Sequence, residues 1–473
     1  MASEPPAGKI KFGEWLPDQN DLDNPGVTEA LNVLPIGTTQ NGYQPYSPLA
    51  TAGAALTTTG TIQNIVALLT IPSTGTVPYI YVGTFDGHLY QSLATVGSWT
   101  DYSPALSTQV FDLVQYNTLV IASVSSAGLY QQTVGAGANF AAISGSPNAL
   151  YLGVIGQFLV GGNILGTPNV VQWSGIGQPT SWPTPGSATA IAQQSGQQTL
   201  HLELGGVTGI FGGDQWGIIT QQNAITRVTY VGGSTVFQFD TLSSGVGMDY
   251  PHVGAKIGNA VLFACSKGFY ETDGVTALPI GQEKVNRWFI TNVVNQNLLS
   301  AGRVGVDWAN KLVYWAFPTA GASPIVIYNY ETKRFTHASD SNVGPFVQGT
   351  SPFYFTTYGL QAIGQDKKLG TFTGTPGTAT ITTAEVELNP GGKALVQGFR
   401  PQVTGAGTVT CKIGSRMKQS DSVTFTSALT PNSVSGFADA LVEASYHRAE
   451  TDIVGSFGQA IGGEFLHNEA GAF

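Results

Sequence analysis

Short apolar runs separated by glycine-containing turns recur along most of the chain. Residues 78–91 place two such runs on either side of Asp86-Gly87, and residues 117–131 place two more before and after Gly128. Residues 259–274 repeat the arrangement around Lys267-Gly268. Glycine at these points permits the positive φ of a tight hairpin turn. The pattern therefore predicts a series of antiparallel β-hairpins.

The hairpins contain an anchor, usually aromatic, that recurs at intervals of 40 to 58 residues. The anchors are Tyr90, Tyr130, Gln172–Trp173, Trp216–Gly217, Tyr270, Tyr328 and Phe372. Blades of β-propellers span roughly 40–50 residues. We therefore expect an all-β fold with a β-propeller of six to eight blades, seven being favoured. A generic series of hairpins in a sandwich is the alternative that this pattern leaves open.

The pattern changes at both ends of the chain. Residues 1–45 contain several prolines and few strand signals, which predicts an irregular N-terminal arm. Residues 376–473 contain new period-two segments, at 384–388 and 408–416, which predict a small β-sandwich-like docking domain. The propeller is then expected over 46–375, with a short helical insertion near 283–299. The apolar positions on one face of that helix are Val285, Trp288, Phe289 and Val293.

Composition supports the all-β prediction and narrows the function. The chain has 61 glycines and only 10% charged residues, against roughly 25% in an ordinary soluble domain. Its net charge is −10 and it has no run of Lys or Arg, which argues against tight binding of nucleic acid. No signal peptide is evident, and the longest apolar runs are too short to span a membrane. Cys265 and Cys411 are expected to be reduced, with a disulfide as the less favoured alternative.

Motifs for catalysis or cofactor binding are absent from the sequence. No phosphate-binding glycine loop occurs, and residues 264–268 lack the first glycine of a nucleophile elbow. Asp18 and Asn20 suggest a calcium loop, but Leu22 at the fifth position favours a plain polar turn. The histidines lack metal-ligand spacing, and the one acid–histidine cluster, at 249–252, is expected in a loop between blades. We expect no enzyme activity, no cofactor and no metal.

Several segments together resemble the tail hub or nozzle proteins of short-tailed bacteriophages (podoviruses), which have also been described as packaged-DNA stabilisation factors. They are residues 12–18, 24–26, 29–35 and 41–43, a Trp-Ser…Pro…Trp stretch at 170–182, and residues 313–318, 327–335, 399–401 and 412–416. The order of the segments carries the resemblance, because none of them is diagnostic alone. The candidate interaction residues within them are Trp15, Pro17, Asp18, Pro25, Trp173 and Trp182.

The resemblance implies a virion protein of the phage tail that is made and assembled in the host cytoplasm. Six copies would form a ring below the portal and adaptor proteins. The ring would continue the DNA channel, retain packaged DNA and dock tail fibres or spikes. An acidic, lysine-poor wall suits double-stranded DNA that passes without tight binding. The alternatives are a receptor-binding or glycan-binding propeller of the fibre or spike type and, second, a propeller glycosidase. The repeated Ser-x-Asp turn and the arginine cluster of sialidase-like propellers are absent from the sequence.

Overall fold

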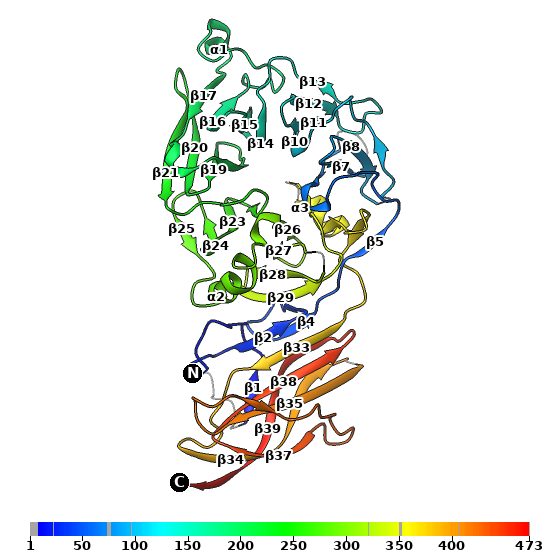
Figure 1. Ribbon diagram of the computed structural model, residues 1–473, viewed down its shortest axis with the longest axis vertical. Coiled ribbons are helices and arrows are strands. Elements are labelled where there is room, and N and C mark those ends of the chain that lie inside the picture. The colour runs from blue at the N-terminus through cyan, green and yellow to red at the C-terminus, as the bar shows by residue number, and fades with distance from the viewer. Residues whose placement is uncertain are drawn as a thin grey trace.

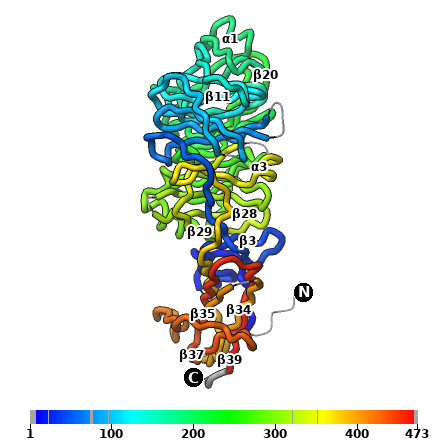
Figure 2. Tube along the Cα trace, turned by 90° about the vertical axis from the view of Figure 1, so that its right-hand side faces the viewer, coloured from blue at the N-terminus to red at the C-terminus, as the bar shows by residue number. Residues whose placement is uncertain are grey.

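The computed structural model describes residues 8–21, 23–72, 77–95, 97–319, 321–349, 352–405 and 407–472. Two bodies built almost wholly of strands are stacked along the long axis of the molecule (Figures 1 and 2). The upper body is a ring of small antiparallel sheets, and the lower body contains both ends of the described chain. The fold is therefore all-β, as predicted.

Six antiparallel sheets of consecutive strands make up most of the ring, and their arrangement is propeller-like. The strands are β6 (Val66–Leu69), β7 (Tyr79–Gly83), β8 (Leu89–Leu93) and β9 (Thr100–Asp101); β10 (Val110–Tyr116), β11 (Leu119–Val124), β12 (Gly128–Thr133) and β13 (Ala141–Ala142); β14 (Ala149–Ile155), β15 (Phe158–Ile164), β16 (Thr167–Trp173) and β17 (Gly196–Thr199); β18 (Val207–Phe211), β19 (Trp216–Gln221), β20 (Ala224–Gly232) and β21 (Val236–Ser244); β22 (Gly254–Ile257), β23 (Ala260–Cys265), β24 (Gly268–Thr272) and β25 (Ala277–Pro279); β26 (Arg303–Asp307), β27 (Leu312–Ala316), β28 (Ser323–Asn329) and β29 (Arg334–Asp340).

A smaller sheet fills the remaining part of the ring. It joins β31 (Gln361–Ile363) and β32 (Leu369–Thr371) to β5 (Ala50–Ala52), which comes from the other end of the ring segment. The short strand β30 (Val347–Gln348) pairs in parallel with β6. Early and late parts of the chain are thus hydrogen-bonded to each other, which ties the ring closed.

The predicted hairpins are confirmed. The pairs β7–β8, β11–β12 and β23–β24 are antiparallel and lie where the three sequence segments place them. Gly87 has φ of 87° in the turn between β7 and β8, a conformation that side-chain-bearing residues rarely adopt. The anchor at Trp216 is an exception among the repeats, since it begins the second strand of its sheet, whereas Tyr90, Tyr130 and Tyr270 lie on third strands.

The lower body consists of two sheets whose inner faces pack together. One continues the β26–β29 sheet through β2 (Val27–Leu31), β33 (Thr378–Thr383), β38 (Tyr446–Val454), β35 (Thr408–Arg416) and β36 (Thr424–Phe425). The other contains β3 (Val33–Pro35), β4 (Tyr43–Pro45), β39 (Gln459–Ala472), β34 (Gly392–Thr404), β37 (Ala438–Ala444) and β1 (Lys9–Lys11). Buried Phe399 and Ile413 belong to the core between them.

The segment predicted as an irregular N-terminal arm, residues 1–45, contains short strands in its described part. Residues 9–45 contribute strands β1 to β4 to the lower body, which therefore includes both ends of the described chain. These strands are only three to five residues long, and β3 and β4 each end on a proline. Although β3 and β4 pair with each other locally, β1, β2 and β4 pair with β33 and β39, several hundred residues away, so neighbouring residues do not predict those pairings.

Helical segments are few and short among the described residues. They are α1 (Ala188–Ala192), α2 (Asn286–Phe289), the π-helical turn η3 (Ile290–Val294), α3 (Pro352–Tyr358) and the 3₁₀ turns η1 (Ile62–Asn64), η2 (Leu202–Leu204) and η4 (Leu299–Ala301). Within the predicted 283–299 insertion, residues 286–294 are helical. Val285, Phe289 and Val293 of its apolar face are fully buried, and Trp288 is partly buried.

Candidate functional site

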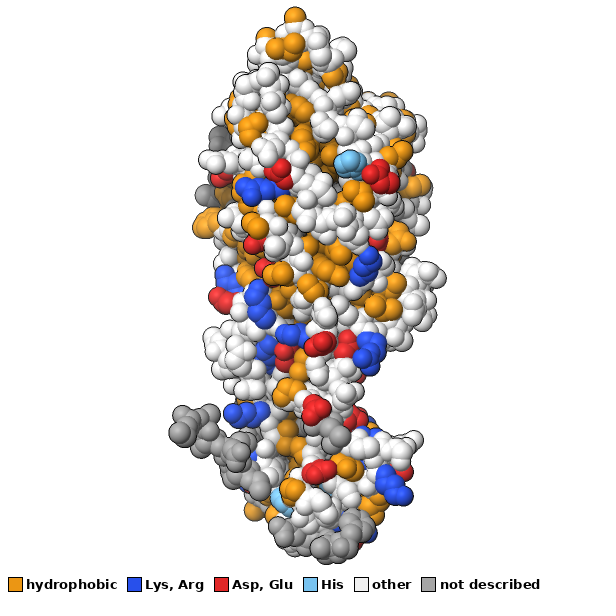
Figure 3. Space-filling view, turned by 90° about the vertical axis from the view of Figure 1, so that its left-hand side faces the viewer, with side chains coloured by type: hydrophobic (Ala, Val, Ile, Leu, Met, Phe, Trp, Pro, Cys, Tyr) orange, Lys and Arg blue, Asp and Glu red, His pale blue; other side chains and the backbone are white. Residues whose placement is uncertain are grey.

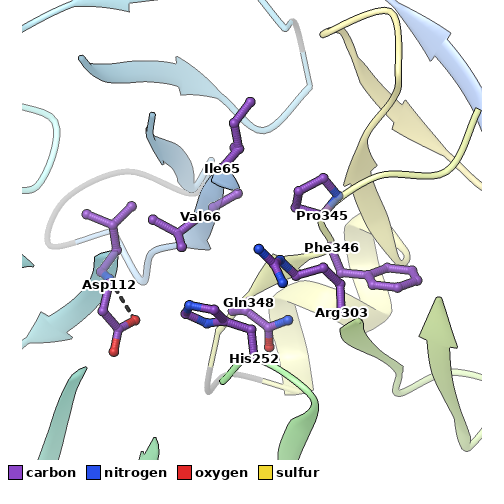
Figure 4. Close-up of a pocket in the computed structure, with 10 residues that line it drawn as sticks. Ile65, Val66, Asp112, His252, Arg303, Pro345, Phe346 and Gln348 are labelled. Atoms are coloured by element: carbon purple, nitrogen blue, oxygen red, sulfur yellow. Dashed lines mark hydrogen bonds between the residues drawn. The ribbon is translucent and has the colours of Figure 1, made fainter. Parts of the chain in front are cut away.

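A small cavity lies at the inner edge of the ring, where the first strands of several sheets meet (Figure 4). Strand β10 lies beside both β6 and β14, so these first strands form the inner wall. The cavity has a volume of about 30 Å³. Its lining residues are Ile65, Val66, Ala67, Asp112, Leu113, His252, Arg303, Pro345, Phe346 and Gln348.

Arg303 is the charged residue most deeply buried at this cavity. It begins β26 and is only 7% exposed. Its guanidinium donates hydrogen bonds to the carbonyl oxygens of Gly302, at 2.7 Å, and Gln63. Among the described residues its Nε has no hydrogen-bond partner and no carboxylate forms an ion pair with it. Burial lowers the pKa of Arg303 to about 10, which leaves it positively charged at neutral pH.

Asp112 and His252 line the same cavity, and burial shifts the pKa of both side chains. The Asp112 carboxylate accepts hydrogen bonds from the backbone N–H groups of Leu113 and Leu152, both at 2.8 Å. Burial nevertheless raises the pKa of Asp112 to about 7. Burial, together with the nearby charge of Arg303, lowers the pKa of His252 to about 3, so this imidazole is neutral. His252 has φ of 62° and lies just before β22.

The sequence analysis did not identify Asp112 or Arg303 as site residues. Each is a charged residue whose neighbours in the sequence are largely apolar. This pattern is the signal by which the sequence could have indicated them as site residues. The 249–252 cluster was expected in a loop between blades, and it does connect β21 to β22. The structure separates its members, however, because His252 faces the cavity whereas Asp249 and Tyr250 line a second hollow.

That second hollow is larger and polar, with a volume of about 480 Å³. It lies beside the turns of the β19–β20 and β23–β24 hairpins and the segment around η3 and η4. Asp249 accepts a hydrogen bond from the backbone N–H of Ser266, and Tyr250 is 41% exposed. The lining residues are Gln222, Asn223, Asp249, Tyr250, Ser266, Val294, Asn297, Leu299 and Ser300. Amide, hydroxyl and aromatic groups thus converge on a space of ligand size.

The part of the ring farthest from the lower body carries almost no charge. No Asp, Glu, Lys or Arg occurs between Asp112 and Glu203, although this segment supplies most of the β10–β13 sheet, the whole β14–β17 sheet and α1. Leu165, Ile191 and Leu202 are apolar residues of this segment that are 57%, 69% and 62% exposed. Figure 3 shows one face, on which charged side chains are concentrated lower down while the top is apolar and neutral.

Three of the predicted interaction residues are buried within the chain, which corrects that prediction for their side chains. Trp15 is fully buried and its ring stacks on His337, with centroids 4.4 Å apart. Trp173 is 5% exposed and donates to the carbonyl of Gln194, and Trp182 is 6% exposed. These tryptophans stabilise the chain itself, since large aromatic surfaces gain most from burial.

The other three predicted interaction residues lie in the N-terminal segment. Pro25 is exposed and Pro17 is partly buried. The Asp18 carboxylate accepts hydrogen bonds from the backbone N–H groups of Arg287, at 2.6 Å, and Trp288, at 2.9 Å. Asp18 therefore caps the first turn of α2 from a distant part of the sequence. Its contacts with a partner stay a prediction.

The polar turn that begins at Asp18, an alternative calcium loop in the sequence analysis, forms ion pairs within the chain. Asp21 Oδ2 lies 3.0 Å from Arg416 Nη2 and 2.9 Å from Arg448 Nη2. Leu22 lies outside the described residues. In the part of the chain that the structure describes, no group of three or more His, Cys, Asp or Glu side chains could hold a metal ion. Nor does any helix there have the length and apolarity to cross a membrane.

The fold and these sites define an all-β protein with a propeller-like ring. The sequence matches no family model and no curated protein. Among solved structures, the chain is similar to a computationally designed protein, Ika8, with 12% identity, a TM-score of 0.38, and coverage of 69% of this chain and 98% of that one. It is also similar to BamB from Moraxella catarrhalis, with 12% identity, a TM-score of 0.36, and coverage of 72% and 92%. Similarity at this level carries no argument about function.

Proposed function

We propose that this chain is a structural virion protein that forms the nozzle, or hub, ring of a short-tailed phage. The ring continues the DNA channel below the portal and adaptor, retains packaged DNA, and docks fibres or spikes. In this proposal each chain carries a seven-bladed propeller, with β30, β31, β32 and β5 forming the seventh blade. The lower body is the docking domain.

The observation that carries the proposal is the uncharged segment between Asp112 and Glu203. Each copy has a net charge of −10, so copies that meet through charged faces repel one another. Protein interfaces are depleted of charged residues at their centres. A contact through this uncharged segment, which includes the β14–β17 sheet and α1, avoids both the repulsion and the cost of desolvating charges. The exposed side chain of Ile191 supplies apolar area to that contact.

The link between ring and lower body also suits a structural role. Arg334 begins β29 in the ring and is 1% exposed. Its guanidinium donates to the carbonyl oxygens of Gly42, at 3.2 Å, and Gly13, at 3.0 Å, and lies over the ring of Tyr43. Buried charge-assisted hydrogen bonds of this kind hold a fixed geometry. The two bodies are thus held in one orientation, as copies in a closed ring require.

Assembly tests the proposal. The purified chain is mixed with the portal and adaptor proteins of its own phage, and mass photometry and electron microscopy measure whether closed rings form. The variant Ile191→Lys is expected to lose ring formation, whereas Val434→Lys, at a 94% exposed position of the lower body, is expected to retain it. Wild-type chain that stays monomeric and never joins the portal–adaptor assembly contradicts the proposal.

The polar hollow beside Tyr250 favours a second candidate, a glycan-binding propeller of the receptor-binding type. Aromatic rings and amide groups recognise sugar faces and hydroxyls, and the hollow offers both. Binding of polysaccharide purified from the host envelope, measured by calorimetry, tests it. Loss of binding in Tyr250→Ala supports this candidate, and wild-type chain that binds no host polysaccharide contradicts it.

A further inference from the structure

The buried guanidinium of Arg303 has no negative partner among the described residues, although it sits at the centre of the ring. An uncompensated charge in an apolar setting is costly, and proteins normally pair it with an opposite charge. Apolar side chains, including Val66 and Phe346, line much of the surrounding cavity. The charge is therefore poorly screened by the protein itself.

Asp112 is the obvious candidate for a counter-charge to Arg303, but its carboxylate is hydrogen-bonded to the backbone instead. Two backbone N–H groups hold its carboxylate, and it forms no ion pair with Arg303 in the part of the chain that the structure describes. His252 is neutral, as its burial dictates, and the Gln348 amide donates to the carbonyl oxygen of Val304. None of these groups neutralises the guanidinium.

We infer that the cavity binds a small monovalent anion of the size of chloride, held by Arg303. The two Nη groups of Arg303 donate to backbone carbonyl oxygens. Its Nε–H has no hydrogen-bond partner among the described residues, so it is available to donate to an anion. A cavity of about 30 Å³ accommodates a water molecule or a monatomic ion. It is small for the four oxygens of sulfate or phosphate. This inference concerns the chain itself and does not depend on the proposed nozzle function.

The place of the site gives the anion a structural role. Val66 and Gln348 belong to β6 and β30, whose parallel pairing joins the early and late parts of the ring. Arg303 also donates to the carbonyl oxygen of Gln63, just before β6. An anion on Arg303 would hold the β26 strand against this junction. Its binding to the folded chain alone would stabilise the ring in proportion to its concentration.

Thermal unfolding at constant ionic strength tests the inference. Sodium bromide or chloride replaces sodium gluconate, and the melting temperature of the full chain is expected to rise and to saturate with halide concentration. Arg303→Met, which keeps an apolar stem, is expected to lose this dependence. The control Arg227→Met removes an arginine that lies over the Trp216 ring, and it is expected to retain the dependence.

If Arg303→Met does not fold, a crystal of the wild-type chain grown in bromide tests the inference without the variant. Anomalous scattering is expected to show bromide within hydrogen-bond distance of Arg303 Nε. Equal melting temperatures in halide and gluconate, or a water molecule at the site in place of bromide, would overturn the inference. A response to sulfate equal to that of halide would also contradict an anion site of this size.

Discussion

The carboxylate of Asp18 lies 2.6 Å from the backbone nitrogen of Arg287, although the two residues are 269 positions apart in the chain. The second carboxylate oxygen accepts from Trp288, so one side chain satisfies two free N–H groups of α2. Val285, which precedes the helix, provides no side-chain cap. The N-terminal segment therefore supplies what the local sequence of the helix lacks.

Removal of this cap is expected to weaken the fold. Asp18→Ala leaves two N–H groups without their acceptor and is expected to lower the free energy of unfolding by about 1 kcal/mol. Chemical denaturation followed by fluorescence measures the change. Asp23→Ala, at an exposed position of the same segment, serves as the control and is expected to change stability by less than ~0.5 kcal/mol. Equal effects of the two substitutions would contradict the capping role.

The buried carboxylate of Glu385 is expected to be essential to the lower body. Its side chain is 2% exposed and lies 2.6 Å from Arg416 Nη2 and 2.9 Å from Arg448 Nη2. Among the described residues, Glu385→Gln leaves Asp21 as the remaining counter-charge for the two neighbouring guanidinium groups, and a loss of about 3 kcal/mol is expected. Denaturant titration measures it.

A matched exposed pair provides the control for Glu385. The side chain of Glu443 is 50% exposed and pairs with Lys393 at 3.3 Å. Glu443→Gln is expected to cost less than ~1 kcal/mol, because solvent screens such pairs. A Glu385→Gln variant as stable as Glu443→Gln would contradict the importance of the buried cluster.

Asp112 is expected to make stability depend on pH. Its pKa is raised from the ordinary 3.8 to about 7, so between these values the folded chain holds a proton that the unfolded chain has released. The stabilisation that Asp112 provides is therefore present at low pH and is lost as pH rises through this window. The stability of wild type minus that of Asp112→Asn is expected to fall with pH, by at most ~1.4 kcal/mol per unit.

His252 offers a control of opposite sign. Its pKa is lowered from 6.5 to about 3, so the unfolded chain takes up a proton first as pH falls. The stability of wild type minus that of His252→Gln is expected to rise with pH over that window. Denaturation curves at several pH values measure both differences. A flat difference for Asp112→Asn would show that its carboxyl is not protonated in the folded chain.

Both cysteines are expected to be inert in the folded protein. Cys265 is 2% exposed and Cys411 fully buried, and burial raises the pKa of each thiol to about 12. The reactive thiolate is therefore scarce at pH 8. Mass spectrometry after iodoacetamide treatment is expected to show no rapid labelling of the native chain and two labels after denaturation without reductant. Rapid native labelling would contradict the burial of these thiols.

Local features of the fold were predictable because their causes are local. The Asp86-Gly87 turn and the alternating runs beside it require only neighbouring residues, and the hairpin they predict is present. The buried face of the 283–299 helix follows from spacing within a few turns. The Trp216 anchor was assigned to the wrong strand of its sheet. All the hairpins share one sequence pattern, so the local sequence does not show which strand of a sheet a given run forms.

The candidate site, in contrast, required the assembled ring. Asp112 lies in β10, Arg303 in β26 and His252 in the loop before β22, so they meet only when three sheets are arranged around one axis. Likewise, the sequence names Trp15 as a candidate interaction residue, and only the tertiary packing, with His337 stacked on its ring, shows that it lies in the core.

By itself, the sequence determined the all-β character, the hairpins and the acidic, charge-poor composition of this protein. Turn chemistry and period-two alternation act between adjacent residues, so they can be read along the chain. Tertiary structure alone decided that strands from residues 9–45 complete the lower body and that Arg303 is buried with no carboxylate paired to it among the residues that the structure describes. Strand pairing and charge compensation depend on distances through space, and residues far apart in sequence set those distances.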